Sequence, residues 1–108
     1  MIDECITEHI DKKLTLSFLS KHINRSENYL SRLFKTETGI NIIQYINYRK
    51  MEKAKDLLMD PQLSINEISN TLGFTEASYF NKIFKKIYDI NPSEYRKKAL
   101  AILRSLDT

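Results

Sequence analysis

Hydrophobic residues recur along the chain at intervals of three and four positions, which is the spacing of amphipathic helices. About seven segments with this spacing follow one another, and short polar stretches separate them. Glycine and proline number only two each, which is few for an all-β protein with many tight turns. The pattern therefore predicts an all-α fold of about seven helices.

Residues that commonly cap helices stand where the predicted helices should begin and end. At the later helix starts these are Thr15, Ser26, Asn41, Ser64, Thr75 and Asn91. Glu67 follows Ser64 by three positions, which is the spacing of a capping box. Gly39 and Gly73 follow the third and fifth helices, where a residue in the left-handed conformation often ends a helix.

The second half of the chain repeats the first in the order of its hydrophobic, capping and basic positions. Residues 16–23 resemble residues 65–72, and residues 29–35 resemble residues 79–85. The offset changes from 49 to 50 between these pairs, so we expect one extra residue at about Ala77. Each repeat predicts a short helix, a tight turn and a second helix with a polar outer face, which is the outline of a helix-turn-helix. On the repeat alone, a generic pair of packed helices remains the alternative.

The predicted organisation is a single domain over residues 1–108, in which two helix-turn-helix subdomains are joined by a long linker helix. The first unit covers about 2–40, the linker helix about 42–59 and the second unit about 64–106. A helix of this length spans about 27 Å, and successive major-groove faces of DNA lie about 34 Å apart. We therefore expect one chain to place two recognition helices in successive major grooves of an asymmetric site.

Charge and cysteine content narrow the class of protein further. The net charge of +3 is only a weak indication of a polyanionic partner, but residues 75–88 carry +2 while residues 1–23 sum to −1. Cys5 is the only cysteine, so no intrachain disulfide can form, which fits the reducing cytoplasm. The chain has neither an apolar run long enough to span a membrane nor a signal-peptide pattern. We expect a soluble, cytoplasmic protein without a membrane partner.

Four stretches of the sequence together resemble the DNA-binding domain of the AraC/XylS family of bacterial transcriptional regulators. They are residues 14–39, 48–58, 63–85 and 91–96, and the resemblance extends over nearly all of residues 1–98. It implies a two-unit helical fold, binding to promoter DNA, and control of transcription through contact with RNA polymerase. Asn24 and Asp89 stand where the family usually has glycine. Both residue types tolerate the left-handed backbone conformation, so we expect the fold to be kept.

Family members commonly carry a further domain that binds an effector, dimerises or receives a signal. Because Met1 directly precedes the first predicted helix, the sequence favours an excised C-terminal domain over a stand-alone regulator. We expect this fragment to be monomeric and the full-length protein to dimerise through the absent domain. The operator sequence, the regulated genes, any effector and the choice between activation and repression cannot be read from these residues.

The resemblance places base contacts on the outer faces of the two recognition helices. These residues are Asn28, Ser31 and Arg32 on the third helix and Ala77, Ser78, Asn81 and Lys82 on the sixth. Arginine can pair with guanine through two hydrogen bonds, asparagine can pair with adenine, and alanine can pack on a thymine methyl group. We expect phosphate contacts from Ser26, Lys35, Arg49, Lys50, Thr75, Lys85 and Lys86. The alternative for each lysine is an ordinary solvated surface position.

Five tyrosines fall at the spacing of core positions, and we interpret them as structural rather than as platforms for stacked bases. They are Tyr29, Tyr45, Tyr48, Tyr79 and Tyr95.

Two other classes of protein compete with a DNA-binding domain. Cys5 and His9 lie four positions apart on one helix, but two ligands without a second pair make a poor zinc site, so no metal is expected. No nucleophile with a matching base and no glycine-rich phosphate loop is present, so we expect neither an enzyme nor a cofactor. A module that binds only proteins would show aromatic or aliphatic anchors on the outer faces, where this chain has polar and basic residues. Nucleic-acid binding without sequence preference remains open as a variant of the DNA-binding hypothesis.

Overall fold

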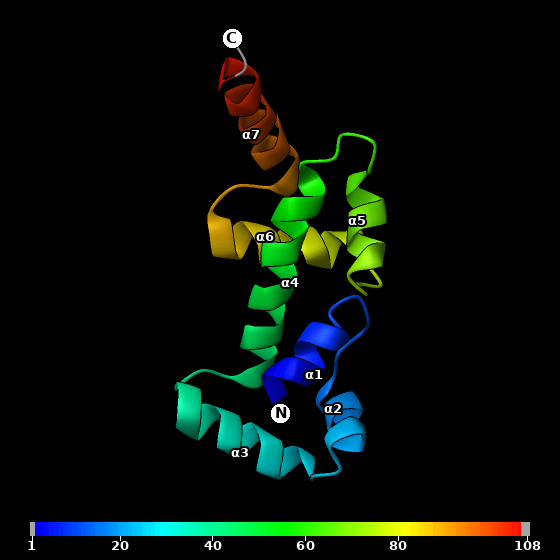
Figure 1. Cartoon of the computed structure of the whole chain (residues 1–108), viewed down its shortest axis with the longest axis vertical. Helices are drawn as coiled ribbons and strands as arrows, with labels where there is room; N and C mark the ends of the chain where they lie inside the picture. The colour runs from blue at the N-terminus through cyan, green and yellow to red at the C-terminus, as the bar shows by residue number, and fades with distance from the viewer. Residues whose placement is uncertain (1, 107–108) are drawn as a thin grey trace.

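The computed structural model describes residues 2–106, which form seven α-helices and no strand (Figure 1). The helices are α1 (Ile2–Glu8), α2 (Leu16–Ile23), α3 (Glu27–Thr38), α4 (Ile42–Leu58), α5 (Ile65–Thr71), α6 (Ala77–Tyr88) and α7 (Pro92–Leu106). The predicted all-α fold is confirmed for these residues. The predicted single domain also included residues 1 and 107–108, which lie outside the described part of the chain.

Five of the six predicted N-terminal capping residues accept a hydrogen bond from the first turn of their helix. They are Thr15, Ser26, Asn41, Ser64 and Asn91, and Ser64 forms the predicted capping box with Glu67. The sixth prediction, Thr75, is wrong. The N-cap of α6 is Glu76, whose side chain makes no capping hydrogen bond. The turn before α6 holds one more residue than the turn before α3, so Thr75 lies one position too early to cap the helix.

The four residues that end helices or turns with positive φ fall at matching places in the two repeats. Asn24 and Gly73 follow α2 and α5, with φ of 61° and 84°. Gly39 and Asp89 follow α3 and α6, with φ of 78° and 61°. Asparagine and aspartate therefore take the left-handed conformation that the sequence predicted for them.

The extra residue of the second repeat lies in the turn that directly precedes Ala77, close to the predicted position. Two residues separate Asn24 from the start of α3, whereas three separate Gly73 from the start of α6. The insertion therefore lies in the turn between Gly73 and Ala77.

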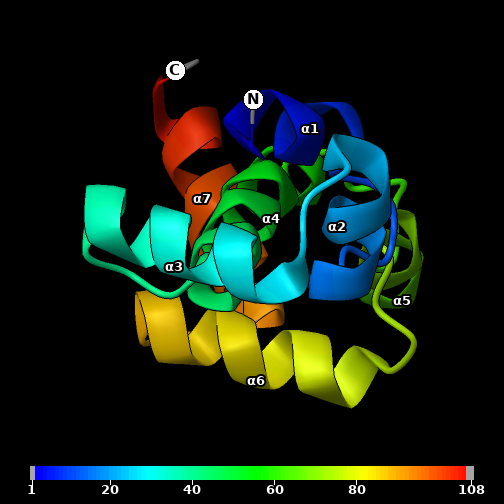
Figure 2. The same cartoon turned by 90° about the horizontal axis from the view of Figure 1, so that it is seen from below.

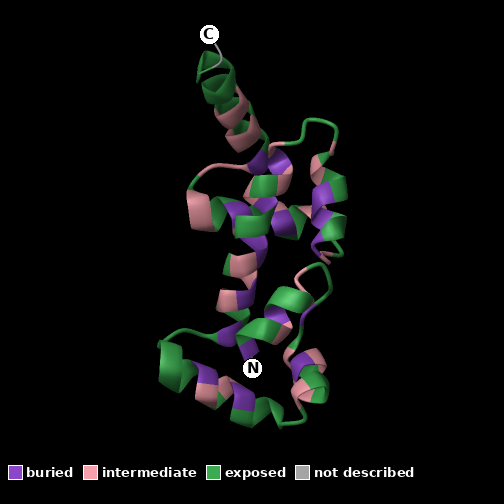
Figure 3. Ribbon diagram, in the orientation of Figure 1, coloured by how far each residue is buried: buried purple, intermediate pink, exposed green. Residues whose placement is uncertain are grey.

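Two hydrophobic cores stand along α4, one for each repeat. We call α1–α3 the first unit and α5–α7 the second unit. Ile42 and Ile46 of α4 belong to the core of the first unit, and Met51, Ala54 and Leu58 belong to the core of the second. Figure 3 shows the buried residues running along α4 and on the inner faces of the helices around it. The long helix is thus part of both cores, which ties the units to one scaffold.

The start of α7 is fixed to the C-terminal end of α4. The Arg96 guanidinium donates hydrogen bonds from Nε to the Leu58 carbonyl oxygen (2.8 Å) and from Nη2 to the Leu63 carbonyl oxygen (2.6 Å). A positive charge near the Leu58 carbonyl is favourable because the last turn of a helix carries a partial negative charge. The end of α7 projects from the molecule and exposes Ile102, Leu103 and Leu106.

The molecule measures 52 × 25 × 22 Å, and α4 runs along its long axis (Figure 1). Seen along that axis, α3 and α6 run in similar directions, and α1 and α6 lie at opposite edges of the molecule (Figure 2). The second helices of both units therefore share one side of α4. Within residues 2–106, no helix combines the length and the apolar character needed to cross a membrane.

Candidate nucleic-acid interface

The outer face of α3 presents the predicted base-reading residues of the first unit together. Leu30 and Phe34 point into the core, so the polar residues at other helical angles lie on the outer face. Asn28 and Arg32 are exposed and line one surface hollow with Ser26, while Ser31 is half-buried beside them. Lys35 is exposed one turn further along the helix. This face can offer hydrogen-bond donors and acceptors to a groove of DNA.

The outer face of α6 presents the corresponding residues of the second unit. Phe80 and Phe84 are fully buried, at positions 50 residues after Leu30 and Phe34. The residues expected at the interface divide by exposure: Ser78, Lys82, Lys85 and Lys86 are exposed, whereas Ala77 and Asn81 are half-buried. Thr75 is exposed in the turn and lines a groove between the two units. The second face is more basic than the first, because it carries three exposed lysines.

Lys50 was expected to contact phosphate, and the structure contradicts this role. Its side chain is only 4% exposed, in the middle of α4. Its ammonium donates hydrogen bonds to the carbonyl oxygens of Lys12 and Leu72. Burial lowers the pKa of Lys50 to about 8, and the nearby Asp11 carboxylate opposes this decrease. An ammonium held inside the fold cannot reach a DNA backbone, so we remove Lys50 from the phosphate contacts.

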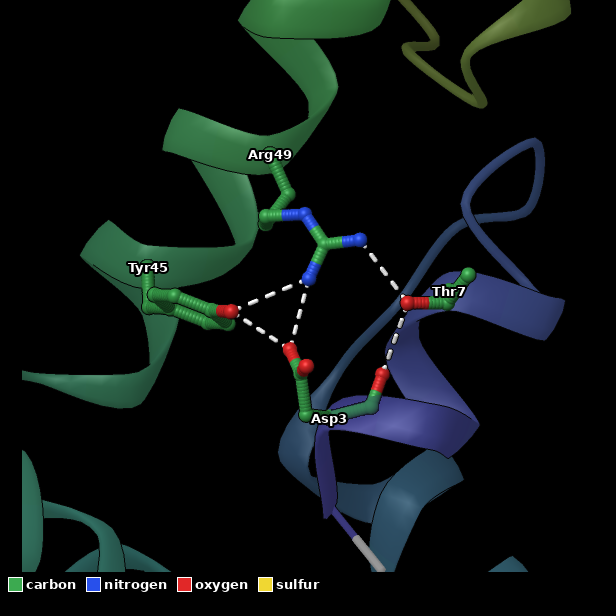
Figure 4. Close-up of polar contacts among 4 residues, drawn as sticks. All are labelled: Asp3, Thr7, Tyr45 and Arg49. Atoms are coloured by element: carbon green, nitrogen blue, oxygen red, sulfur yellow. Dashed lines mark hydrogen bonds and ion pairs between the residues drawn. The ribbon is translucent and has the colours of Figure 1, made fainter.

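Arg49 is also directed away from the side that carries α3 and α6. It points toward α1, where Nη1 lies 2.6 Å from the Asp3 carboxylate and Nη2 donates to the Thr7 hydroxyl at 2.8 Å (Figure 4). The Tyr45 hydroxyl lies 3.0 Å from Nη1 and donates to Asp3 as well. The hydrogen bond with Tyr45 is the main cause that raises the pKa of Arg49; burial opposes this rise, and the Asp3 carboxylate adds a smaller contribution to it. These bonds join α1 to α4, and we withdraw the expected phosphate contact at Arg49.

Comparisons with known proteins agree on one family. A family model described as a helix-turn-helix domain matches residues 19–98. The chain is 40% identical over 91 residues to the xylose operon regulatory protein of Escherichia coli (strain K12), covering 84% of this chain and 23% of that protein. It is 41% identical to the C-terminal domain of the two-component response regulator yesN from Fusobacterium nucleatum, with a TM-score of 0.82 and coverage of 88% and 93%. The chain belongs to the AraC/XylS family of transcriptional regulators.

A further solved structure shares the fold of this AraC/XylS domain. It is a transcriptional regulator of the AraC-type DNA-binding class from Chromobacterium violaceum, 24% identical, with a TM-score of 0.79 and coverage of 90% and 87%. The chain spans well under half the length of the curated relatives it matches, for example 35% and 23% of two of them.

Three tyrosines of this AraC/XylS domain are exposed, although the sequence predicted structural roles for them. Tyr29, Tyr48 and Tyr79 have 46%, 52% and 47% of their surface accessible. Tyr45 and Tyr95 are half-buried and pack against the two cores, as predicted. Tyr29 and Tyr79 directly precede a buried residue, so each is rotated by about 100° from the centre of the inner face.

These exposed tyrosines add residues to the candidate interface. Tyr29 lines the same hollow as Asn28 and Arg32, and Tyr79 lines the groove between the units. The repeat was the signal for them, because it places a tyrosine at the same edge of both recognition helices.

Cys5 and His9, the two potential metal ligands in the sequence, lie close together, and the described residues place no third ligand beside them to complete a metal site. Cys5 Sγ lies 3.9 Å from His9 Nδ1, and burial raises the pKa of the Cys5 thiol. Among the residues that the structure describes, no group of three or more His, Cys, Asp or Glu side chains is placed to hold a metal ion.

Proposed function

We propose that this domain binds double-stranded DNA by sequence and affects transcription initiation at an asymmetric promoter site. The α3 and α6 helices enter successive major grooves on one side of the duplex. The observation that carries this proposal is the presentation of both helices, with matched polar outer faces, on the same side of α4. The 17 residues of α4 span about 25 Å, and α3 lies beyond its N-terminal end (Figure 1), which adds to the separation.

The two faces would read bases by different chemistry. On α3, Arg32 can donate two hydrogen bonds to one guanine, and Asn28 can pair with adenine. On α6, Lys82 offers a single ammonium, and Ser78 discriminates little between bases. We propose that the first unit contributes more sequence preference than the second.

Phosphate contacts would hold both helices in register on the duplex. The exposed lysines Lys35, Lys85 and Lys86 stand beside the recognition faces. Ser26 is the N-cap of α3, and Thr75 directly precedes the N-cap of α6. Backbone N–H groups at helix starts favour a phosphate, since they carry a partial positive charge. Glu27 and Glu76 also lie at the starts of α3 and α6. Their carboxylates would repel a nearby phosphate, which limits where the DNA backbone can lie.

The activity of the whole protein belongs to the same proposal, because the chain spans only part of its relatives. We propose that bound DNA is coupled to transcription through contact with RNA polymerase, in the cytoplasm where bacterial DNA lies. Residues 1–108 would bind DNA as a monomer.

The test is selection of bound sequences from a random duplex library, repeated at two salt concentrations. We expect a motif with two unequal clusters about one helical turn, or roughly 10 base pairs, apart. Arg32→Ala should relax one cluster and Lys82→Ala the other, each by roughly 1–3 kcal/mol. Lys53→Ala, an exposed lysine beside Arg49 on the α1 side, is the matched control and should change neither.

Two results would contradict this proposal in different ways. A motif with a single base cluster would mean that one unit binds phosphates without reading bases. No motif at all, with affinity that vanishes as the salt concentration rises, would leave only non-specific phosphate binding.

A further inference from the structure

A buried charge, the Lys50 ammonium, lies where the two units meet. Lys50 stands on α4 between Ile46, the last helix residue in the core of the first unit, and Met51, the first in the core of the second. A buried lysine is rare unless its charge has partners. Its burial therefore requires partners that offset the cost of removing the ammonium from water.

Those partners come from both units. The Lys12 carbonyl belongs to the loop that joins α1 to α2, and the Leu72 carbonyl belongs to the C-cap of α5. The Lys50 ammonium also lies 5.3 Å from the centre of the Phe74 ring, in the turn before α6. The carbonyl at a helix end carries a partial negative charge that favours a cation. One side chain thus bonds the backbone of the first unit to the backbone of the second.

The backbones of the two units also touch directly beside this lysine. A Cβ atom at Gly73 would lie 2.5 Å from the carbonyl carbon and oxygen of Lys12 and 2.7 Å from the nitrogen of Lys13. Glycine is the residue that allows this approach, since every other residue has a Cβ. Lys50 and Gly73 therefore form one junction, in which the same Lys12 carbonyl contacts both.

This junction gives the two units a second connection besides α4. Pairs of helices with extensive contacts either belong to one unit or include α4. A connection through α4 alone leaves the units able to pivot about that helix. A second point of attachment, away from the helix axis, removes that freedom and fixes α3 relative to α6.

We infer that Lys50 is a positioning residue that fixes the distance and angle between α3 and α6, and so sets the spacing between the two base clusters that the domain accepts. This inference rests on the proposed function for its effect on DNA, although its structural part stands without it. Lys50 touches no DNA in this scheme and acts through the Lys12 and Leu72 carbonyls.

The first experiment measures tolerance to operator spacing. The duplex is the selected site, with its two clusters moved closer or further apart by one base pair. The wild-type domain should bind the altered spacings at least about tenfold more weakly, because a shift of about 3.4 Å misaligns one set of base contacts. Lys50→Met keeps an unbranched side chain but donates no hydrogen bond. The Lys50→Met domain should bind the native spacing more weakly than wild type does. Its preference for the native spacing over the altered spacings should be less than about threefold.

Controls separate a positioning role from a general loss of stability. Lys50→Arg can still donate to two carbonyls and should keep the wild-type spacing preference. Lys53→Met removes an exposed lysine from the same helix and should also keep it. If Lys50→Met lowers affinity for every spacing by the same factor, Lys50 only stabilises the fold and the inference is wrong. If circular dichroism shows that Lys50→Met is unfolded, Lys50→Gln replaces it, because its side-chain amide can still donate a hydrogen bond to a carbonyl.

A second experiment needs no DNA and separates this inference from the proposed function. Spin labels are attached at Glu37→Cys on α3 and Lys97→Cys on α7, two exposed positions, in a Cys5→Ser background. The distribution of distances between the labels should be narrow with Lys50 or Lys50→Arg and broader with Lys50→Met. An equally narrow distribution in Lys50→Met would overturn the inference, whether or not the domain selects a DNA motif.

Discussion

The two helix-turn-helix units have corresponding inner faces, yet their turns are held in different ways. In the first unit the turn is stabilised locally. The Ser20 hydroxyl donates to the Arg25 carbonyl at 2.5 Å, and Ser26 accepts from the Tyr29 N–H at 3.1 Å. In the second unit no side chain caps α6, and the turn lies against Lys12 and Lys50 instead. The first turn depends on its own residues, whereas the second depends on the other unit.

This difference shows that the two repeats are more alike in α3 and α6 than in the turns that precede these helices. The inner faces match, with Leu30 and Phe34 at the positions of Phe80 and Phe84. The inserted residue lengthens the second turn, and the Phe74 ring packs 5.5 Å from Phe80 and beneath Lys50. Changes in the second turn should therefore affect both units, and changes in the first turn should stay local.

The largest expected effect on stability comes from Gly73→Ala. The new Cβ adds strain at φ of +84° and a collision with the Lys12 backbone, so the free energy of unfolding should fall by about 2–5 kcal/mol. Gly39→Ala is the control, because Gly39 has φ of +78° but nothing within 4 Å of the added Cβ. It should lose only about 1–2 kcal/mol. Equal decreases in the free energy of unfolding for the two variants, measured by urea denaturation, would show that Gly73 is not in close contact with the first unit.

Much of the fold could be predicted because it depends on residues close together in the chain. The spacing of Leu30 and Phe34 identifies the inner face of α3, and Ser26 marks its start. Lys50 could not be assigned in this way. A lysine is usually exposed, and its burial here depends on two carbonyls that lie 38 and 22 residues away.

Prediction of the candidate site was limited in the same way, because contacts between distant residues could not be read from the sequence. The sequence identified which faces of α3 and α6 are polar, because that follows from helical periodicity. It misplaced Tyr29 and Tyr79, which stand at the edge of the inner face, where periodicity alone does not separate buried from exposed. Arg49 faces α1 because Asp3, 46 residues away, accepts its hydrogen bond.

The two reading faces can be compared by exchanging their cations. Arg32→Lys replaces a guanidinium fork with a single ammonium, so discrimination for guanine at the first cluster should fall by roughly 1–3 kcal/mol. Lys82→Arg should keep or sharpen the second cluster. Affinities for duplexes that differ at one base pair give the measurement. A larger loss at the second cluster than at the first would reverse the proposed ranking of the units.

The charge at the junction predicts a dependence of stability on pH. The pKa of Lys50 is about 8 in the folded state, below its ordinary value of 10.5, so between these values the unfolded chain binds more protons. Stability should therefore rise, by on the order of 1 kcal/mol from pH 7 to pH 9, relative to Lys50→Met. Lys53→Met should follow the wild type. A difference between wild type and Lys50→Met that stays constant over this range would contradict the burial of the charge.

The smallest expected effects come from the two helix starts, and they test the comparison most directly. Ser26→Ala removes the hydroxyl that accepts from the Tyr29 N–H, so the free energy of unfolding should fall by about 0.5–1 kcal/mol. Glu76→Ser supplies a capping hydroxyl where α6 has none, and should raise it by a similar amount. If instead Glu76→Ser lowers stability, the contacts of the second turn with the first unit hold the start of α6 in a geometry that a serine cap does not fit. Denaturant midpoints measured at pH 7 distinguish these outcomes, because both variants leave Lys50 and Gly73 in place.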